Sequence, residues 1–249
     1  MHILVLEGAH VEAEFRAKFG ADHAVTFWAE TALDPASAAE FEAAWETHYD
    51  EQQAALVEHL AAADVVFAFA SGADLPPLLP GKVLFVEATT KPLAGALFGP
   101  GGDRATPVYG FCGLPTLLNR SLLEVSMVLG GDEAPLRDVC ARLGTDYRTV
   151  ADRVGLATPR VLAMLVNEAC YTLQEGTAEA RDIDRAMQLG TNYPRGPLAW
   201  GDALGTDRVL AVLDAMWADT HDGRYRACPL LRTRAALGEA LAEPPIDAD

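Results

Sequence analysis

The sequence predicts a chain of two parts, an α/β domain with a parallel sheet followed by an all-helical domain. Short apolar runs alternate with helical stretches over residues 1–150, the pattern of strand–helix–strand units with right-handed crossovers. From residues 150–158 onward only helical periodicity remains. A chain of 249 residues has room for two such units. We therefore expect one domain at 1–153 and a second at 154–249.

The expected strands are short runs of apolar residues that end at turn-forming or polar residues. The first run begins at His2 and stops before Gly8, and its continuous apolar character is typical of a strand covered on both faces of a sheet. The other runs have similar length, and we expect all of them to pair in parallel. In chain order, the expected strands are residues 2–6, 25–28, 64–70, 82–86, 106–111 and 122–129.

Helices are expected where apolar residues recur every three or four positions and where glycine or proline marks an end. In the second domain, Thr158 is expected to act as an N-cap, with Pro159 at the first helical position. That helix is expected to stop at Gly176, and a later one to open at Thr206. The remaining expected helices are residues 11–19, 36–62, 134–143, 177–189, 198–204 and 229–237.

The composition limits the partners that this chain can have. Half of the residues are hydrophobic and the mean hydropathy is +0.09, so a sizeable core is expected. The formal net charge of −17 and the pI near 4.6 argue against binding to nucleic acid or to anionic membranes, which repel a negative surface. An anionic small molecule would require a local patch of arginine or lysine.

The cysteines and the absence of a long apolar segment indicate a cytoplasmic protein. Cys112, Cys140, Cys170 and Cys228 lie far apart, so their spacing supports neither a zinc site nor a disulfide framework. We expect reduced thiols and no metal. No apolar run reaches the roughly 18–20 residues that span a bilayer, and the N-terminus begins directly as a strand without the charged leader of a signal peptide.

The turn after the first strand is where a dinucleotide site would lie. Such a site needs three small residues in the pattern G-x-G-x-x-G or A, so that the diphosphate can approach the helix N-terminus. The corresponding residues here are Gly8, His10 and Ala13. An imidazole at the second position obstructs the diphosphate, whereas Glu30 stands near the place of a ribose-binding acid. NAD binding is therefore expected to be weak or absent.

The helical half carries short motifs in the order Asn167-Glu168-Ala169, Asp182-Ile183-Asp184-Arg185-Ala186-Met187, Leu189-Gly190, Tyr193-Pro194-Arg195-Gly196-Pro197-Leu198 and Asp202-Ala203-Leu204-Gly205. In these motifs it resembles the C-terminal domain of the 3-hydroxyacyl-CoA dehydrogenase family. The resemblance is strong over about residues 154–235 and weaker, mostly positional, over residues 1–153. An alternative interpretation is that these glycines and prolines only set the geometry of helical hairpins.

The resemblance implies a fold, a ligand and an assembly. It implies an N-terminal Rossmann-like domain and a C-terminal helical domain of the 6-phosphogluconate/3-hydroxyacyl-CoA dehydrogenase type. It also implies NAD as cofactor, an acyl-CoA ligand, a homodimer formed through the helical domain, and a role in fatty acid metabolism. Each of these is an expectation drawn from the family.

The family's catalytic positions are only partly kept. In the family a histidine, held by a glutamate, removes the substrate hydroxyl proton while hydride leaves for NAD. Setting Glu124 on that glutamate places Cys112 on the histidine. A thiol with a pKa of about 8.5 is a poor general base beside a carboxylate, so Cys112 is interpreted as a packed residue. Without a histidine, Glu124 is expected to pair with an arginine such as Arg120.

Three further positions bear on the chemistry. Thr90 keeps the hydroxyl that the family supplies to the substrate oxygen, although a threonine pair after a strand is often only turn chemistry. Pro159 stands in place of the family's catalytic asparagine, and Ala68 in place of a strand glutamate. If an anionic acyl-CoA binds, we expect Lys91, Arg120 and Arg160, together with Arg104, to converge on the cleft between the domains.

These departures favour a dimeric acyl-CoA-binding relative whose NAD-dependent activity is weakened or lost. The alternative is an active oxidoreductase that converts (3S)-3-hydroxyacyl-CoA to 3-oxoacyl-CoA with NAD. A third hypothesis is a different reaction in the same cleft that uses His10 or Cys112.

Overall fold

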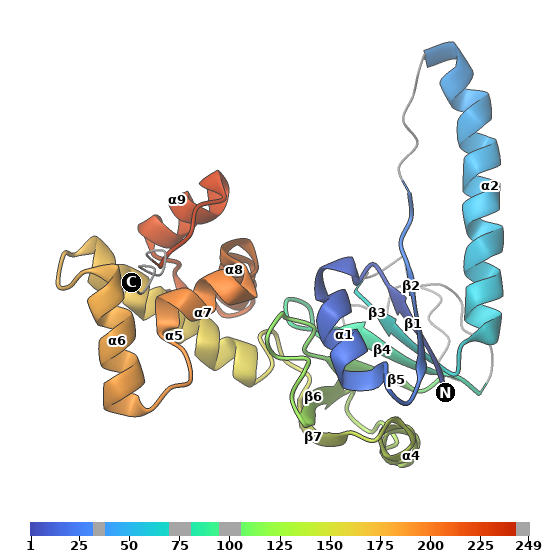
Figure 1. Cartoon of the computed structure of the whole chain (residues 1–249), viewed down its shortest axis with the longest axis horizontal. Coiled ribbons are helices and arrows are strands. Elements are labelled where there is room, and N and C mark those ends of the chain that lie inside the picture. Colours follow the sequence, from blue (N-terminus) through green and yellow to red (C-terminus); the bar gives the residue numbers. More distant parts are fainter. Residues whose placement is uncertain (32–37, 70–80, 95–105, 243–249) are drawn as a thin grey trace.

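The structure is a computed structural model that describes residues 1–31, 38–69, 81–94 and 106–242. Arg104, the first two residues of the expected helix 36–62 and the last residue of the expected strand 64–70 lie outside these residues. Figure 1 shows an α/β domain built on one sheet, with a group of helices lying beside it. The long helix α2 (Ala38–Ala62) extends well beyond the sheet (Figure 1).

One seven-stranded sheet forms the α/β domain, in the order β2-β1-β3-β4-β5-β6-β7. The strands are β1 (His2–Leu6), β2 (Ala24–Trp28), β3 (Val65–Ala68), β4 (Val83–Glu87), β5 (Val108–Phe111), β6 (Leu122–Met127) and β7 (Asp146–Ala151). The four pairs among β2, β1, β3, β4 and β5 are parallel, as expected. The expectation fails at β6, which runs antiparallel to β5. The connecting residues 112–121 are shorter than the dozen or so that a parallel crossover needs.

Both faces of the sheet are covered. On one face lie the 3-10 turn η1 (Ala9–Val11), α1 (Glu12–Phe19) and α4 (Ala134–Leu143). Their core includes Phe15 and Phe19, packed against Phe67 of β3. On the other face, Leu56 and Leu60 of α2 pack against apolar side chains of β1, β3 and β4. Burial of each such large apolar side chain contributes about 1.5–3 kcal/mol.

The helical domain is organised around one central helix. Its elements are α5 (Thr158–Gln174), α6 (Ala180–Thr191), α7 (Pro197–Leu204), α8 (Thr206–Thr220), η3 (Gly223–Tyr225) and α9 (Pro229–Leu237). Helix α5 contacts α6, α7, α8 and α9. The expected helix 177–189 is displaced to Ala180–Thr191, because the left-handed residue that ends it is Asn192, at φ 56°, and not Gly190.

The two domains share a core at their junction. Apolar residues that follow β4 and β5 (Ala88, Cys112, Leu114 and Leu117) pack in one cluster with residues of the helices. The last strand ends at Ala151 and α5 begins at Thr158, while the division at 153/154 stays a prediction. Within the residues that the structure describes, no helix is both long and apolar enough to span a membrane.

Candidate functional site

The carboxyl ends of β1, β3, β4 and β5 meet at the junction with the helical domain. In open parallel sheets, ligands bind in the crevice outside these ends. The residues that follow the strands pack closely there: a Cβ added at Gly8 would lie 2.9 Å from the ring of Phe69, and one added at Gly113 only 2.5 Å from it. This packing therefore requires glycine at positions 8 and 113. The ring of Phe69 lies between Gly8, which follows β1, and Gly113, which follows β5.

His10 lies over this surface. It belongs to η1, and its ring meets the ring of Phe69 edge to face with 5.0 Å between centroids. Partial burial and then the positive charge of Arg208 lower the pKa of His10, opposed by the carboxylates of Asp207 and Glu14. The imidazole thus stands at the second glycine position, facing the start of α8. These residues do not fit the diphosphate of a nicotinamide dinucleotide, which needs bare main chain at that point.

The other expected cofactor residues lie on the surface around the same turn. Ala13 is exposed in the first turn of α1, and Glu30 is exposed after β2. The backbone N–H of Glu30 donates to the carboxylate of Glu7 at 2.9 Å. Glu7 itself adopts a left-handed conformation with φ 56°. Two carboxylates therefore stand where a single ribose-binding acid was expected.

Glu87 is a carboxylate that the sequence interpretation did not single out. It ends β4, and its Oε1 accepts hydrogen bonds from the backbone N–H of Thr89 at 3.1 Å, from the Thr89 hydroxyl, and from the N–H of Gly113 at 3.4 Å. Burial raises the pKa of Glu87, although these donors act in the opposite direction. A signal was present: a charged residue closes an otherwise apolar strand.

The two threonines after β4, Thr89 and Thr90, have different surroundings. Thr89 is buried, and its hydroxyl is the one that contacts Glu87. Its carbonyl accepts the N–H of Gly155 at 2.7 Å, which links β4 to the start of the helical domain. Thr90 is half-buried and Lys91 is exposed. The role of the Thr90 hydroxyl stays a prediction.

Cys112 lies between two carboxylates but inside the core. Burial raises its pKa to about 12, and the charges of Glu87 and Glu124 act in the same direction. Its backbone N–H donates to the carbonyl of Glu124 at 3.3 Å, so the two residues are neighbours on adjacent segments. A thiol with this pKa stays protonated at neutral pH and cannot accept a substrate proton.

Glu124 holds the start of α5. One carboxylate oxygen accepts the N–H of Ala157 at 2.5 Å, and both oxygens accept the N–H of Thr158, at 3.1 and 3.0 Å. The expected N-cap at Thr158 is therefore wrong: Ala157 is the N-cap residue and makes no side-chain cap bond, while Glu124 supplies the acceptor from strand β6. The expected pair with Arg120 is not found among the described residues, and the Nε–H of Arg120 donates to the carbonyl of Leu117 at 2.9 Å.

Two further carboxylates accept hydrogen bonds from backbone N–H groups at the junction. Asp152 accepts from Leu93 at 2.8 Å and from Ala94 at 3.0 Å. Glu14 of α1 accepts from Thr116 at 2.6 Å and from Asn119 at 3.4 Å. The Thr116 hydroxyl in turn accepts the indole N–H of Trp200 on α7, at 3.3 Å. Charge-assisted bonds of this kind hold the loops after β4 and β5 in place.

The expected arginines do not converge on one site. The guanidinium of Arg160 donates to the Tyr225 hydroxyl at 2.6 Å and to the carbonyl of Val154, and lies over the Tyr225 ring at 5.4 Å. It lines a cavity of about 370 Å³ with Arg153. Arg120 lines a different cavity, beside α1. Among the residues that the structure describes, no group of three or more His, Cys, Asp or Glu side chains is arranged to hold a metal ion.

Comparison with known proteins begins with the helical domain. The family described as 3-hydroxyacyl-CoA dehydrogenase, C-terminal domain, matches residues 155–243. 3-Hydroxyadipyl-CoA dehydrogenase of Escherichia coli is 50% identical over 94 residues, which are 38% of this chain and 20% of that protein. Probable 3-hydroxybutyryl-CoA dehydrogenase of Bacillus subtilis is 38% identical over 120 residues, 47% of this chain and 42% of that protein. The chain thus spans less than half the length of these relatives.

Solved structures extend the likeness to the whole fold. FadB2 of M. tuberculosis superposes with a TM-score of 0.71 at 18% identity, over 96% of this chain and 94% of that one. (S)-3-Hydroxybutyryl-CoA dehydrogenase PaaH1 from Ralstonia eutropha gives a TM-score of 0.65 at 21% identity, over 95% and 94%. At such identities the likeness shows the fold alone. It confirms the expected class, a Rossmann-type α/β domain followed by a helical domain of the hydroxyacyl dehydrogenase type.

The family likeness in sequence lies in the helical domain. The helical domain carries the family's own C-terminal domain, and its named relatives are hydroxyacyl-CoA dehydrogenases. Residues 155–243 match the C-terminal domain of the 3-hydroxyacyl-CoA dehydrogenase family, as the helical motifs predicted.

Proposed function

We propose that this chain is an acyl-CoA-binding member of the family in which NAD-dependent dehydrogenation is weakened or lost. One observation carries the proposal: the position expected for the catalytic imidazole holds the buried thiol of Cys112, with a pKa raised to about 12. Losing a general base costs about 10²–10⁴ in rate. The acyl-CoA ligand is inferred from the relatives, whose names describe dehydrogenases of hydroxyacyl-CoA thioesters.

Weak or absent NAD binding is the second part of this proposal. It is supported by His10, whose ring packs on Phe69 at the point where a diphosphate would have to approach the main chain. The acidic residues Glu12 and Glu14 in the first turn of α1 act in the same direction, because they oppose an anion at that helix N-terminus.

A second candidate function is the active oxidoreductase, which would convert (3S)-3-hydroxyacyl-CoA to 3-oxoacyl-CoA with NAD. The observation that favours it is Glu87. Its raised pKa and fixed position next to Cys112 are properties that a general base needs. In that case Glu87, and not Cys112, would accept the hydroxyl proton of the substrate.

Assembly as a homodimer through the helical domain also belongs to this proposal. It is supported by large apolar side chains that are exposed on the helices of that domain, namely Val161, Leu189, Trp217 and Leu237. Sedimentation of the full chain at tens of micromolar tests it, and a monomer would count against it. A cytoplasmic location is inferred from the four cysteines, all of which are free and buried.

Parallel ligand titrations test the proposed function. The full chain is titrated by calorimetry with NADH and, separately, with acetoacetyl-CoA. The proposal expects acetoacetyl-CoA to bind with micromolar affinity and NADH to bind weakly or not at all. Micromolar binding of NADH would favour the active oxidoreductase, and failure of both ligands to bind would remove the acyl-CoA proposal.

A further inference from the structure

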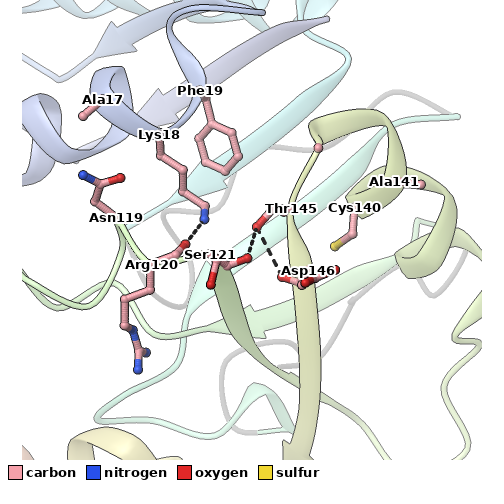
Figure 2. Close-up of a pocket in the computed structure, with 11 residues that line it drawn as sticks. Ala17, Lys18, Phe19, Asn119, Arg120, Ser121, Cys140, Ala141, Thr145 and Asp146 are labelled. Carbon is pink, nitrogen blue, oxygen red and sulfur yellow. Dashed lines mark hydrogen bonds between the residues drawn. The ribbon is translucent and has the colours of Figure 1, made fainter.

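A polar groove lies on the face of the sheet that α1 and α4 cover, away from the strand ends described above. Its main part is a cavity of about 560 Å³ between α1, the loop that leads into β6, α4 and the start of β7. Figure 2 shows its lining, with Lys18 and Phe19 on one side and Ser121, Thr145 and Asp146 on the other. A second hollow of about 380 Å³ shares Cys140, Ala141, Thr145 and Asp146 with it, so the two are continuous. We call them together the α1–α4 groove.

The charge of the groove contrasts with that of the whole chain. The protein carries a formal net charge of −17, yet the groove is lined by the cations Lys18, Arg120, Arg137 and Arg148 and by only two carboxylates, Glu133 and Asp146. The carboxylate of Glu133 is already engaged by the hydroxyl of Tyr147 at 2.8 Å. A local excess of positive charge in a hollow attracts an anion even when the protein as a whole is acidic.

Lys18 is a half-buried cation of this groove. Its ammonium donates to the carbonyl of Arg120 and lies 5.4 Å from the centre of the Phe19 ring (Figure 2). An ammonium carries three N–H donors, and that carbonyl uses one of them. Burial and then the charge of Arg120 lower the pKa of Lys18. A bound anion would offset both effects, since it pairs the ammonium and screens it from Arg120.

The remaining lining suits an oxyanion and its polar substituents. Asn119 and Ser121 add an amide and a hydroxyl beside the ammonium. The thiol of Cys140 stays neutral, because burial raises its pKa to about 11. Lysine binds phosphate as a point charge, and volumes of about 300–1,000 Å³ are typical of small-molecule sites.

We propose that the α1–α4 groove binds a phosphoryl anion on a molecule of nucleotide size, with the ammonium of Lys18 as its main contact. The site shares no residue with the strand ends at which Glu87 and Cys112 lie, so it is independent of the proposed function. Two sources of the phosphoryl group fit this chemistry, a free nucleotide and the nucleotide end of coenzyme A. The binding of ADP and of coenzyme A distinguishes them.

Calorimetric titration of the full chain at low ionic strength tests this proposal, with pyrophosphate, ADP and coenzyme A as the probes. We expect ADP to bind, and Lys18→Gln to weaken its binding about tenfold, the effect of losing one charge-assisted contact. Lys18→Arg keeps the charge and should retain most of the affinity. Asp146→Asn removes the carboxylate of the main cavity and should tighten binding. Tighter binding of coenzyme A than of ADP would assign the site to the coenzyme.

The matched control is Arg142→Gln. Arg142 lies on α4, which borders the groove, but it does not line the groove and faces Asp64 at 4.0 Å. Its replacement changes the net charge by the same amount as Lys18→Gln. Unchanged binding in this variant is expected. Equal weakening by Lys18→Gln and Arg142→Gln, or failure of all three probes to bind at millimolar concentration, would overturn the proposal. The unfolding midpoint of each variant, measured without ligand, shows whether weaker binding results from a loss of folding. If Lys18→Gln does not fold, Asp146→Asn still tests the site.

Discussion

Both carboxylate oxygens of Glu124 accept the backbone N–H of Thr158, at 3.1 and 3.0 Å. This contact joins strand β6 to the first turn of α5, where the first N–H groups of a helix have no partner within the helix. A negative charge at this end also interacts favourably with the helix dipole. Glu124 therefore has a structural role that does not depend on a catalytic histidine.

Replacing Glu124 should destabilise the fold. We expect Glu124→Ala to lower the free energy of unfolding by about 1–3 kcal/mol, because the N–H groups of Ala157 and Thr158 lose their acceptor. Urea unfolding of the full chain measures this. The matched control is Glu239→Gln, which removes an exposed carboxylate 3.5 Å from Arg234 and should cost no more than about 1 kcal/mol. Equal effects of the two substitutions would contradict the structural role.

Cys112 should be unreactive in the folded protein. A thiol that is buried and has a pKa of about 12 presents almost no thiolate at neutral pH, and the thiolate is the reactive form. We expect an aromatic disulfide reagent to label Cys112 only as fast as the chain unfolds, with mass spectrometry to identify the labelled residue. Rapid stoichiometric labelling of Cys112 in the native state would mean that the thiol is accessible and activated.

The sequence predicted the buried part of the fold better than its exposed edge. Strands β1, β3, β4 and β5 were recognised because most of their side chains are apolar and buried, and the edge strand β2 was recognised from its apolar residues Val25, Phe27 and Trp28. Strand β7 was missed: it lies at the edge of the sheet, and Asp146, Arg148 and Thr149 expose polar side chains that resemble a loop. The pattern of apolar residues could not predict the direction of β6 either, because parallel and antiparallel strands can carry the same pattern.

In the candidate site, the sequence did not predict which groups the side chains hydrogen-bond to. Cys112 and Glu124 lie next to each other, because the segments that carry them pair across β5 and β6. The acceptor role of Glu124 could not be foreseen, since its partners are backbone N–H groups, which any residue supplies. Arg160 was expected to face a cleft, whereas its guanidinium donates to the Tyr225 hydroxyl. Nothing in the sequence marks Tyr225, which lies 65 residues away, as its hydrogen-bond partner.

His10 should limit the affinity for NADH. We expect His10→Gly to tighten NADH binding by about tenfold or more, equivalent to roughly 1.4 kcal/mol, because the main chain becomes accessible to the diphosphate. His10→Ala should give a smaller gain, since a methyl group still stands at that position. Fluorescence titration with NADH measures both variants. Identical affinity in the wild type and in His10→Gly would show that the imidazole is not the obstacle.

Glu87 should make stability depend on pH. Its pKa is raised in the folded chain, so the folded state holds the proton more tightly than the unfolded one. The free energy of unfolding should therefore fall as the pH rises above about 4.3, the ordinary pKa of glutamate, until the folded-state pKa is passed. Glu87→Gln stays neutral and should become progressively more stable than the wild type over that range. Urea unfolding at a series of pH values tests this, and a difference that stays constant with pH would argue against a raised pKa.

The rate at which the purified full chain oxidises NADH in the presence of acetoacetyl-CoA decides whether dehydrogenase activity has been lost. We expect a rate indistinguishable from background, because Cys112 cannot exchange the proton and His10 obstructs the cofactor. A rate well above background that is lost in Glu87→Gln would contradict it, and would establish an active dehydrogenase with a carboxylate as its general base.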